Sequence, residues 1–344
     1  MGVSEGRLQS ELWRGAVPVE VRLAPDEVAD VTTPAPLYAL VPRAAYLPLW
    51  HNEPGGPREH FADALPEAST RTSPWFEHDG LPLRWQLTAG TLFDLLSCAR
   101  GADPPNELPW RLTVHYRPYG SAAADDAGAA SSASRSASSA SQFQCGDEDT
   151  VRAHFFNALK EATYVVQGSA GGVMSMTRAA QTDLWRSVRT GNRQLAYRAE
   201  AELNGSTEEG GGPREGESGK GSGSSEERPH AGGGGGGGGG NRTRRVPLRV
   251  YVLDGGDGRR ELKAWSDVVC ASVPVPAASA RTLGDALACA GVAVASGVDE
   301  AGGGTRDVRA VVEGVDVSLA TGLDVLYAHF KGADHFLHVC VSRF

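Results

Sequence analysis

Two stretches far apart in the chain alternate apolar and polar side chains with the two-residue period of a β-strand. The first covers residues 17–23 (VPVEVRL) and the second covers residues 246–252 (VPLRVYV), and each has proline at its second position. A T-L-x-D-x-L string follows each stretch, at residues 91–96 and 282–287, with apolar residues one helical turn apart and a threonine that can cap a helix. Matching patterns in the same order favour an internal repeat.

Each half of this repeat ends on another strand pattern. Residues 110–116 (WRLTVHY) close the first half, and residues 336–341 (FLHVCV) close the second. Each half therefore contains strands, then a helix and then further strands. This is the order of elements in the β-grasp, or ubiquitin-like, fold, so we expect one such domain in each half.

The middle of the chain has a helical period instead. An acidic run at residues 147–149 and Thr150 suit the start of a helix, because carboxylates interact favourably with the helix dipole and threonine can cap the first turn. Gly168 is expected to end this helix, and a second helix is expected at about residues 178–190. The apolar side chains that these helices should bury are Val151, Phe155, Ala158, Leu159, Ala162 and Val166 in the first, and Leu184, Trp185 and Val188 in the second.

Two low-complexity segments separate these pieces. Residues 121–141 are almost entirely alanine and serine, and residues 201–244 hold glycine, serine and glutamate, including the glycine run 232–240. Neither can bury enough apolar surface to offset the entropy of ordering it. The sequence thus predicts an α+β protein with two ubiquitin-like β-grasp domains flanking a helix-rich domain, joined by two disordered low-complexity linkers. The expected boundaries are 1–120 for an N-terminal helix and the first ubiquitin-like domain, 121–145 for the first linker, 146–200 for the helix-rich domain, 201–244 for the second linker and 245–344 for the second ubiquitin-like domain.

Composition excludes several classes of function. The chain has 33 basic and 42 acidic residues, a formal net charge of −9, which argues against nucleic-acid binding because that requires clustered basic side chains. Its five cysteines are an odd number without C-x-x-C spacing, so we expect no zinc site, no disulfide framework and a reducing compartment. The first twenty residues lack the apolar core of a signal peptide, and no apolar stretch is long enough to span a membrane. These features predict a soluble intracellular protein without a metal or a cofactor.

Catalytic patterns are weak. The string GVSEG at residues 2–6 has the spacing of a nucleophile elbow, but no strand precedes it. His335 and His338 point to opposite faces of a strand, so they cannot bind one metal ion. His338 and Cys340 share a face and could form a nucleophile–base pair, but a buried cysteine beside a satisfied histidine is more usual. We therefore predict a protein that is not an enzyme.

Lys160 is the most informative single residue. It is one of only four lysines, with Lys220, Lys263 and Lys331. At 100° per residue it lies opposite the apolar stripe of the first predicted helix, with Phe156 and Tyr164 one turn away on either side. Such an amine could be presented to a partner, or it could be an ordinary solvated lysine. The pattern alone favours the ordinary interpretation.

Several strings in all three ordered pieces closely resemble the autophagy protein 5 family. They are residues 42–49 (PRAAYLPL), 75–85 (WFEHDGLPLRW), 108–112 (LPWRL), 154–162 (HFFNALKEA), 183–185 (DLW), 246–251 (VPLRVY), 282–285 (TLGD) and 335–339 (HFLHV). The resemblance implies two ubiquitin-like domains flanking a helix-rich domain, in agreement with the repeat.

The resemblance also implies a function. Lys160 would accept an isopeptide bond from the C-terminal glycine of the ubiquitin-like modifier autophagy protein 12, delivered by a transient conjugating enzyme. A groove between the domains would bind an amphipathic helix of autophagy protein 16. The resulting complex would act like a ligase, promoting transfer of autophagy protein 8 to phosphatidylethanolamine. The chain would itself be non-catalytic, cytoplasmic and peripherally associated with the phagophore membrane.

Other residues and functions remain open at this point. Leu8, Leu12 and Trp13 form an apolar patch before the first strand, which could line the partner-helix groove or cap its own domain. A short basic cluster could favour anionic lipid, although such charges are more often merely solvated. The alternative function is a ubiquitin-like adaptor that binds partners without conjugation, and an enzyme using His338 and Cys340 ranks far below. The basic cluster consists of Arg242, Arg244, Arg245 and Arg249.

Overall fold

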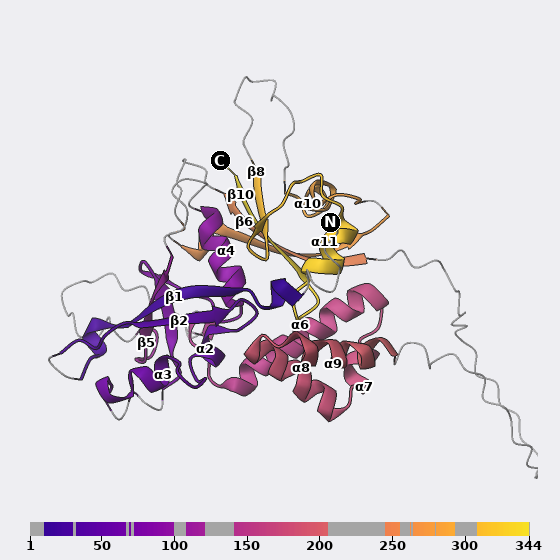
Figure 1. Ribbon diagram of the computed structural model, residues 1–344. Coiled ribbons are helices and arrows are strands. Elements are labelled where there is room, and N and C mark those ends of the chain that lie inside the picture. Colours follow the sequence, from indigo (N-terminus) through magenta and orange to yellow (C-terminus); the bar gives the residue numbers. More distant parts are fainter. Residues whose placement is uncertain are drawn as a thin grey trace, which may run out of the picture.

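Two five-stranded sheets and a helical bundle pack together in the computed structural model (Figure 1). The chain runs from the first sheet through the bundle to the second sheet. The structure describes residues 10–29, 32–66, 69, 72–99, 108–120, 141–205, 245–254, 262, 264–278, 280–292 and 308–343.

The first sheet has the strand order β2-β1-β5-β3-β4. Its central strands β1 and β5 are parallel, and the other neighbouring strands are antiparallel. Helix α4 packs against the sheet and shares its apolar core. The strands are β1 (Ala16–Leu23), β2 (Leu37–Pro42), β3 (Trp75–His78), β4 (Leu81–Pro82) and β5 (Trp110–His115), and the helices are η1 (Pro25–Glu27), α2 (Leu47–Trp50), α3 (Pro57–His60), η2 (Ala62–Ala64) and α4 (Ala89–Ala99).

The second sheet repeats this topology with the order β7-β6-β10-β8-β9. Its first and last strands in the sequence, β6 and β10, are again the parallel pair at the centre. The predicted repeat and α+β class are therefore confirmed, because two separate segments give the same strand order. The elements are β6 (Arg245–Asp254), η6 (Trp265–Asp267), β7 (Val268–Pro276), α10 (Leu283–Cys289), β8 (Val308–Val312), β9 (Val315–Asp316), α11 (Leu323–Phe330) and β10 (Leu337–Arg343).

The two T-L-x-D-x-L strings begin their helices differently. In the second, Thr282 is the N-cap of α10, and its hydroxyl accepts a hydrogen bond from the Asp285 amide while the Asp285 carboxylate accepts one from the Thr282 amide. In the first string, the prediction that Thr91 caps the helix is wrong, because α4 begins one turn earlier. The hydroxyl of Thr88, the residue before the helix, accepts from the Thr91 amide at 3.3 Å. Asp94 is thereby free for a contact between domains.

The bundle contains four helices within the described residues. Asp147 caps α6 by accepting from the Thr150 amide, so the cap is the aspartate rather than the threonine, and Gly168 ends the helix in the left-handed conformation at φ 72°. The second predicted helix is present as α8, with the expected apolar side chains buried. The sequence did not predict α7 or α9. The helices are α6 (Glu148–Gln167), α7 (Gly171–Ser175), α8 (Arg178–Thr190) and α9 (Arg193–Gly205).

Both predicted linkers begin or end inside packed structure. Helix α9 continues to Gly205, because Leu203 is buried in the bundle core one turn beyond Ala199. At the end of the first predicted linker, Phe143 packs on Tyr119, and Cys145 is buried in the bundle core. The prediction that residues 201–205 and 141–145 belong to linkers is therefore wrong. The rest of both linkers lies outside the described residues.

The two sheets share one apolar core. The face of the second sheet that carries Tyr251 and Cys340 packs on the first domain, while the opposite face packs on its own helices α10 and α11. Cys340 donates to the Thr91 carbonyl at 3.8 Å, and Trp265 donates to the Pro82 carbonyl at 2.6 Å. Because apolar contacts and hydrogen bonds cross this boundary, the domains have a defined relative placement.

A charged histidine at the end of β5 gives a prediction for pH. His115 lies 3.2 Å from a Glu27 oxygen and 3.5 Å from a Glu77 oxygen, and it stacks on Trp75. Burial opposes protonation, but the two carboxylates outweigh it and raise the pKa of His115 to about 9. Because the folded state raises this pKa, charged His115 stabilises the fold. The stabilisation is complete below the unfolded-state pKa near 6.5, and it is lost as pH rises through 9.

Replacing His115 by Gln should therefore cost more stability at pH 6 than at pH 9.5. The expected difference in free energy of unfolding is of order 2 kcal/mol, measured by urea unfolding at the two pH values. An equal loss at both values would contradict the assignment of a charged His115.

Candidate functional site

Lys160 lies in the fourth turn of α6 with its side chain half-buried. Phe156, one turn before it, is also half-buried, and Tyr164, one turn after it, is 62% exposed. The outward direction predicted from the helical period is consistent with this partial exposure. Within the described part of the chain, no carboxylate forms an ion pair with the Lys160 ammonium group. The amine therefore remains available to a reagent from outside.

All three domains hold the helix that carries Lys160. Phe155 and Leu159 are buried in the bundle core, where Phe155 contacts Trp185. Ala158 and Ala162 pack against Phe336 of the second ubiquitin-like domain. From the first domain, Tyr46 and Trp85 contact His154 edge to face. A helix fixed on three sides presents its outer face in one orientation.

Next to Lys160, charged side chains connect helix α6 to the second sheet. The Glu161 carboxylate accepts a hydrogen bond from the Arg249 guanidinium of β6 at 3.3 Å and one from the Ser272 hydroxyl of β7 at 3.0 Å. Arg249 also pairs with Asp334 at 3.5 Å, and His338 lies 3.1 Å from the same carboxylate. Burial alone would raise the pKa of Asp334, but His338 and Arg249 lower it to about 2. Asp334 is therefore ionised inside the interface between the bundle and the second sheet.

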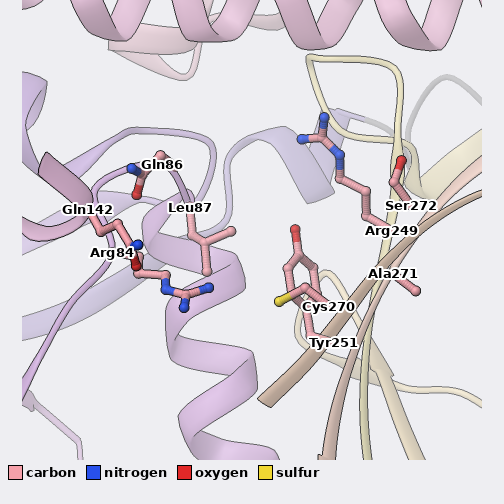
Figure 2. A pocket seen from close by; sticks show the side chains of 9 residues that line it. All are labelled: Arg84, Gln86, Leu87, Gln142, Arg249, Tyr251, Cys270, Ala271 and Ser272. Atoms are coloured by element: carbon pink, nitrogen blue, oxygen red, sulfur yellow. The ribbon is translucent and has the colours of Figure 1, made fainter. Parts of the chain in front are cut away.

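A cleft of about 430 Å³ opens next to this connection. One wall comes from the segment between β4 and α4, and the other is the face of the second sheet formed by β6 and β7 (Figure 2). The side chains of Arg84 and Arg249 enter it from opposite sides (Figure 2). Its lining residues are Arg84, Gln86, Leu87, Gln142, Arg249, Tyr251, Cys270, Ala271 and Ser272.

The arrangement of His338 and Cys340 does not support nucleophilic catalysis. His338 directs Nδ1 to the Tyr251 hydroxyl at 3.0 Å and Nε2 to Asp334, so both ring nitrogens are engaged away from the thiol. Cys340 is 2% exposed and donates to a backbone carbonyl, and burial raises the pKa of its thiol well above the usual range. Each residue has a structural role in the interface between domains.

The predicted partner-helix residues are only partly described. Leu8 lies outside the described residues, while Leu12 and Trp13 are half-buried and precede β1. Both line a small cavity of about 30 Å³ together with Phe330 and Lys331 of the second domain. Trp13 also packs against the bundle core, so part of its surface stabilises its own fold.

Of the predicted basic cluster, the structure describes Arg245, which is exposed, and Arg249. Arg242 and Arg244 lie outside the described residues, and Arg245 begins β6. Arg249 is turned inward to Glu161 and Asp334.

Among the described residues, no group of His, Cys, Asp and Glu side chains could hold a metal ion, and none of the described helices has the length and apolar character needed to cross a bilayer.

Sequence reasoning missed the cleft and Arg84, and it assigned Arg249 only to the basic cluster. Arg84, Arg249 and Glu161 come from three segments with no shared spacing, so no local pattern connects them. One weak signal existed for Glu161: it lies 100° from Lys160 around the helix, at the edge of the apolar stripe, where a charge must find a partner or solvent.

Three family models match the chain. They are described as the UblA domain of autophagy protein ATG5 over residues 12–116, its alpha-helical bundle region over residues 148–195 and its UblB domain over residues 245–341. These ranges correspond to the first sheet, the bundle and the second sheet.

Curated relatives and a solved structure agree with these matches. Autophagy protein 5 of Arabidopsis thaliana is 31% identical over 270 residues, which cover 77% of this chain and 70% of that protein. Autophagy protein 5 of Oryza sativa subsp. indica is 38% identical over 181 residues, which cover 53% of this chain and only 40% of the rice protein. A crystal structure of Kluyveromyces marxianus Atg5 has a TM-score of 0.62 and 18% identity, covering 97% of this chain and 98% of that one, and this likeness shows the fold.

Proposed function

Because the chain belongs to the autophagy protein 5 family, we propose that Lys160 accepts an isopeptide bond from the ubiquitin-like modifier autophagy protein 12. Family membership supports a role in autophagy, and the position of Lys160 supports the finer assignment. The observation that carries it is a half-buried lysine without an ion-pair partner among the described residues, on a helix that three domains hold in place.

The chemistry requires a free amine. The neutral nitrogen of Lys160 attacks the carbonyl of a modifier held as a thioester on the conjugating enzyme. The C–N bond forms, the C–S bond breaks, the thiolate leaves on the enzyme and the amine loses a proton to solvent. No described carboxylate pairs with Lys160, so we assign its activation to the conjugating enzyme.

The full assembly extends this proposal. With autophagy protein 16, the conjugate would form a ligase-like complex that promotes attachment of autophagy protein 8 to phosphatidylethanolamine. In it, this chain is a non-catalytic scaffold that moves from the cytoplasm to the phagophore membrane. The separation of His338 from Cys340 supports a non-catalytic role.

Trp13 gives a prediction for the partner helix. We expect Trp13→Ala to weaken capture of an autophagy protein 16 helix about tenfold or more, because truncating an aromatic anchor in a groove costs roughly 2 kcal/mol. Pull-down and titration with the helix measure the effect. Tyr38→Ala is the matched control, because Tyr38 is an aromatic residue 63% exposed on the first sheet. Unchanged capture by a folded Trp13→Ala protein would count against a groove at this site.

The alternative is an adaptor that binds partners through its ubiquitin-like domains without conjugation. Reconstitution with autophagy protein 12 and its two activating enzymes separates the two functions on a denaturing gel. Conjugation gives a band heavier by one ubiquitin-like protein, which survives boiling and reductant. If the proteins co-migrate in native conditions but no such band forms, the adaptor is the correct function.

A further inference from the structure

The cleft between the first domain and the second sheet has two guanidinium groups on opposite sides (Figure 2). Its volume of about 430 Å³ lies within the range of roughly 300–1,000 Å³ typical of ligand sites. Cys270 and Ser272 on the second-sheet wall are exposed, and they belong to β7, the terminal strand of the sheet. The cleft is therefore reachable from solvent and larger than a bare ion requires.

Aromatic rings hold both arginines in place. The Arg84 guanidinium lies 4.6 Å from the centre of the Trp265 ring, and that of Arg249 lies 3.9 Å from the centre of the Phe336 ring. Stacking fixes the plane of a guanidinium while its edge keeps N–H donors. The Arg84 Nε is buried and has no hydrogen-bond partner among the described residues.

The protein already binds one carboxylate at the rim of the cleft. Glu161 accepts from Arg249 and from the Ser272 hydroxyl, and its side chain is 51% exposed. The donors of this wall therefore fit a carboxylate. On the other side, no carboxylate of the described residues forms an ion pair with Arg84. Both terminal nitrogens of Arg249 already donate to carboxylates, one to Glu161 and the other to Asp334, so of the two arginines it is Arg84 that can take a further acidic group.

We propose that this cleft is a docking site for an acidic peptide segment, whose carboxylate side chain binds Arg84 on the wall opposite Arg249. A carboxylate takes two N–H bonds from one guanidinium, and the remaining volume accommodates the peptide backbone and a neighbouring side chain. The site does not involve the amine of Lys160, so this proposal and the proposed conjugation stand or fall separately.

The rates at which two reagents alkylate the Cys270 thiol test whether the cleft attracts a carboxylate. Iodoacetate and iodoacetamide alkylate the same thiolate, with the C–S bond forming as iodide leaves, but only iodoacetate carries a carboxylate. Burial raises the pKa of Cys270 and Arg84 lowers it. Both reagents react with the same thiolate, so the effect of this pKa cancels in the ratio of the two alkylation rates. Exposed Cys289 on α10 is the internal reference. At low salt we expect the iodoacetate-to-iodoacetamide ratio to be about tenfold higher at Cys270 than at Cys289.

Variants test the source of this preference. Arg84→Gln should reduce the ratio at Cys270 at least fivefold, whereas Arg186→Gln, which removes an exposed arginine of α8, should leave it unchanged. Glu161→Gln removes the resident carboxylate and should raise the ratio. An unchanged rate at Cys289 and an unchanged melting temperature verify that each variant is folded. Equal ratios at Cys270 and Cys289 in the wild-type protein would overturn the proposal.

Competition identifies the ligand class. Acetylated and amidated tri-glutamate should slow alkylation of Cys270 by iodoacetate, and the matching tri-glutamine peptide should not. If inorganic phosphate protects the thiol and tri-glutamate does not, the cleft takes a free anion, and the assignment to an acidic peptide is wrong. If neither protects, no oxyanion site exists there.

Discussion

Lys160→Arg is expected to abolish the covalent adduct with autophagy protein 12 while the protein stays folded. An arginine keeps the positive charge and a similar aliphatic stem, but its guanidinium is not deprotonated near neutral pH and so has no nucleophilic lone pair. The Lys160 ammonium has no ion-pair partner among the described residues, so the substitution breaks no ion pair with them. Adduct formation in the reconstituted reaction should fall below detection, at least 100-fold.

Lys331→Arg is the matched control for this experiment. Lys331 is a partly exposed lysine that pairs with Glu200 at 3.6 Å, a contact that arginine can also make. This variant should form the adduct at the wild-type rate. If Lys331→Arg loses the adduct and Lys160→Arg keeps it, the acceptor is on the second domain.

The second large effect is expected at the contact between the two ubiquitin-like domains. Arg43 follows β2 and forms an ion pair with Asp94 of α4, which is 4% exposed. The Asp94 carboxylate also accepts from the Gly314 amide, at 2.7 Å, and Glu313 lies 3.7 Å from Arg43. Arg43 thus neutralises two acidic groups, one from each domain. Burial raises the pKa of Asp94, and Arg43 opposes that shift.

Arg43→Ala should therefore destabilise the protein by about 3–5 kcal/mol, because removing one partner leaves a buried charge uncompensated. Urea unfolding at pH 7 measures this loss. The matched control is Arg309→Ala, since Arg309 pairs with Asp316, whose side chain is 64% exposed, and its loss should cost no more than about 1 kcal/mol. If both variants lose the same stability, the buried pair does not hold the domains together.

The repeat could be predicted from the sequence because each strand of the central pair has its own alternating pattern. Residues 17–23 and 246–252 carry that pattern without reference to the rest of the chain, and their partners β5 and β10 do so as well. Helix α6 was predictable for the same reason, since its apolar stripe and Gly168 are local features. Local signals suffice where one element buries one face.

Other features depend on contacts between distant segments, which no single pattern contains. Thr91 resembles a cap as much as Thr282 does, and only the position of the Thr88 hydroxyl shows that α4 starts earlier. Helix α9 lies next to a glycine-rich segment, and its burial depends on α8. The Arg84–Arg249 cleft requires the docked domains, so it has no counterpart in the sequence.

Site residues show the same division. Lys160 was identified by its helical position and by the family resemblance, and its role stays a prediction. Leu12 and Trp13 line a cavity between domains, but their partner is untested. Cys340 and His338 share a strand face, yet the Asp334 and Tyr251 contacts that separate them come from other segments.

Peptide mapping of the reconstituted wild-type adduct tests the central claim most directly. After proteolysis, mass spectrometry locates the lysine joined to the C-terminal glycine of the modifier. We predict one branched peptide, carrying Lys160 of helix α6, with the other three lysines unmodified. A branched peptide on Lys220, Lys263 or Lys331 in place of Lys160 would contradict the account.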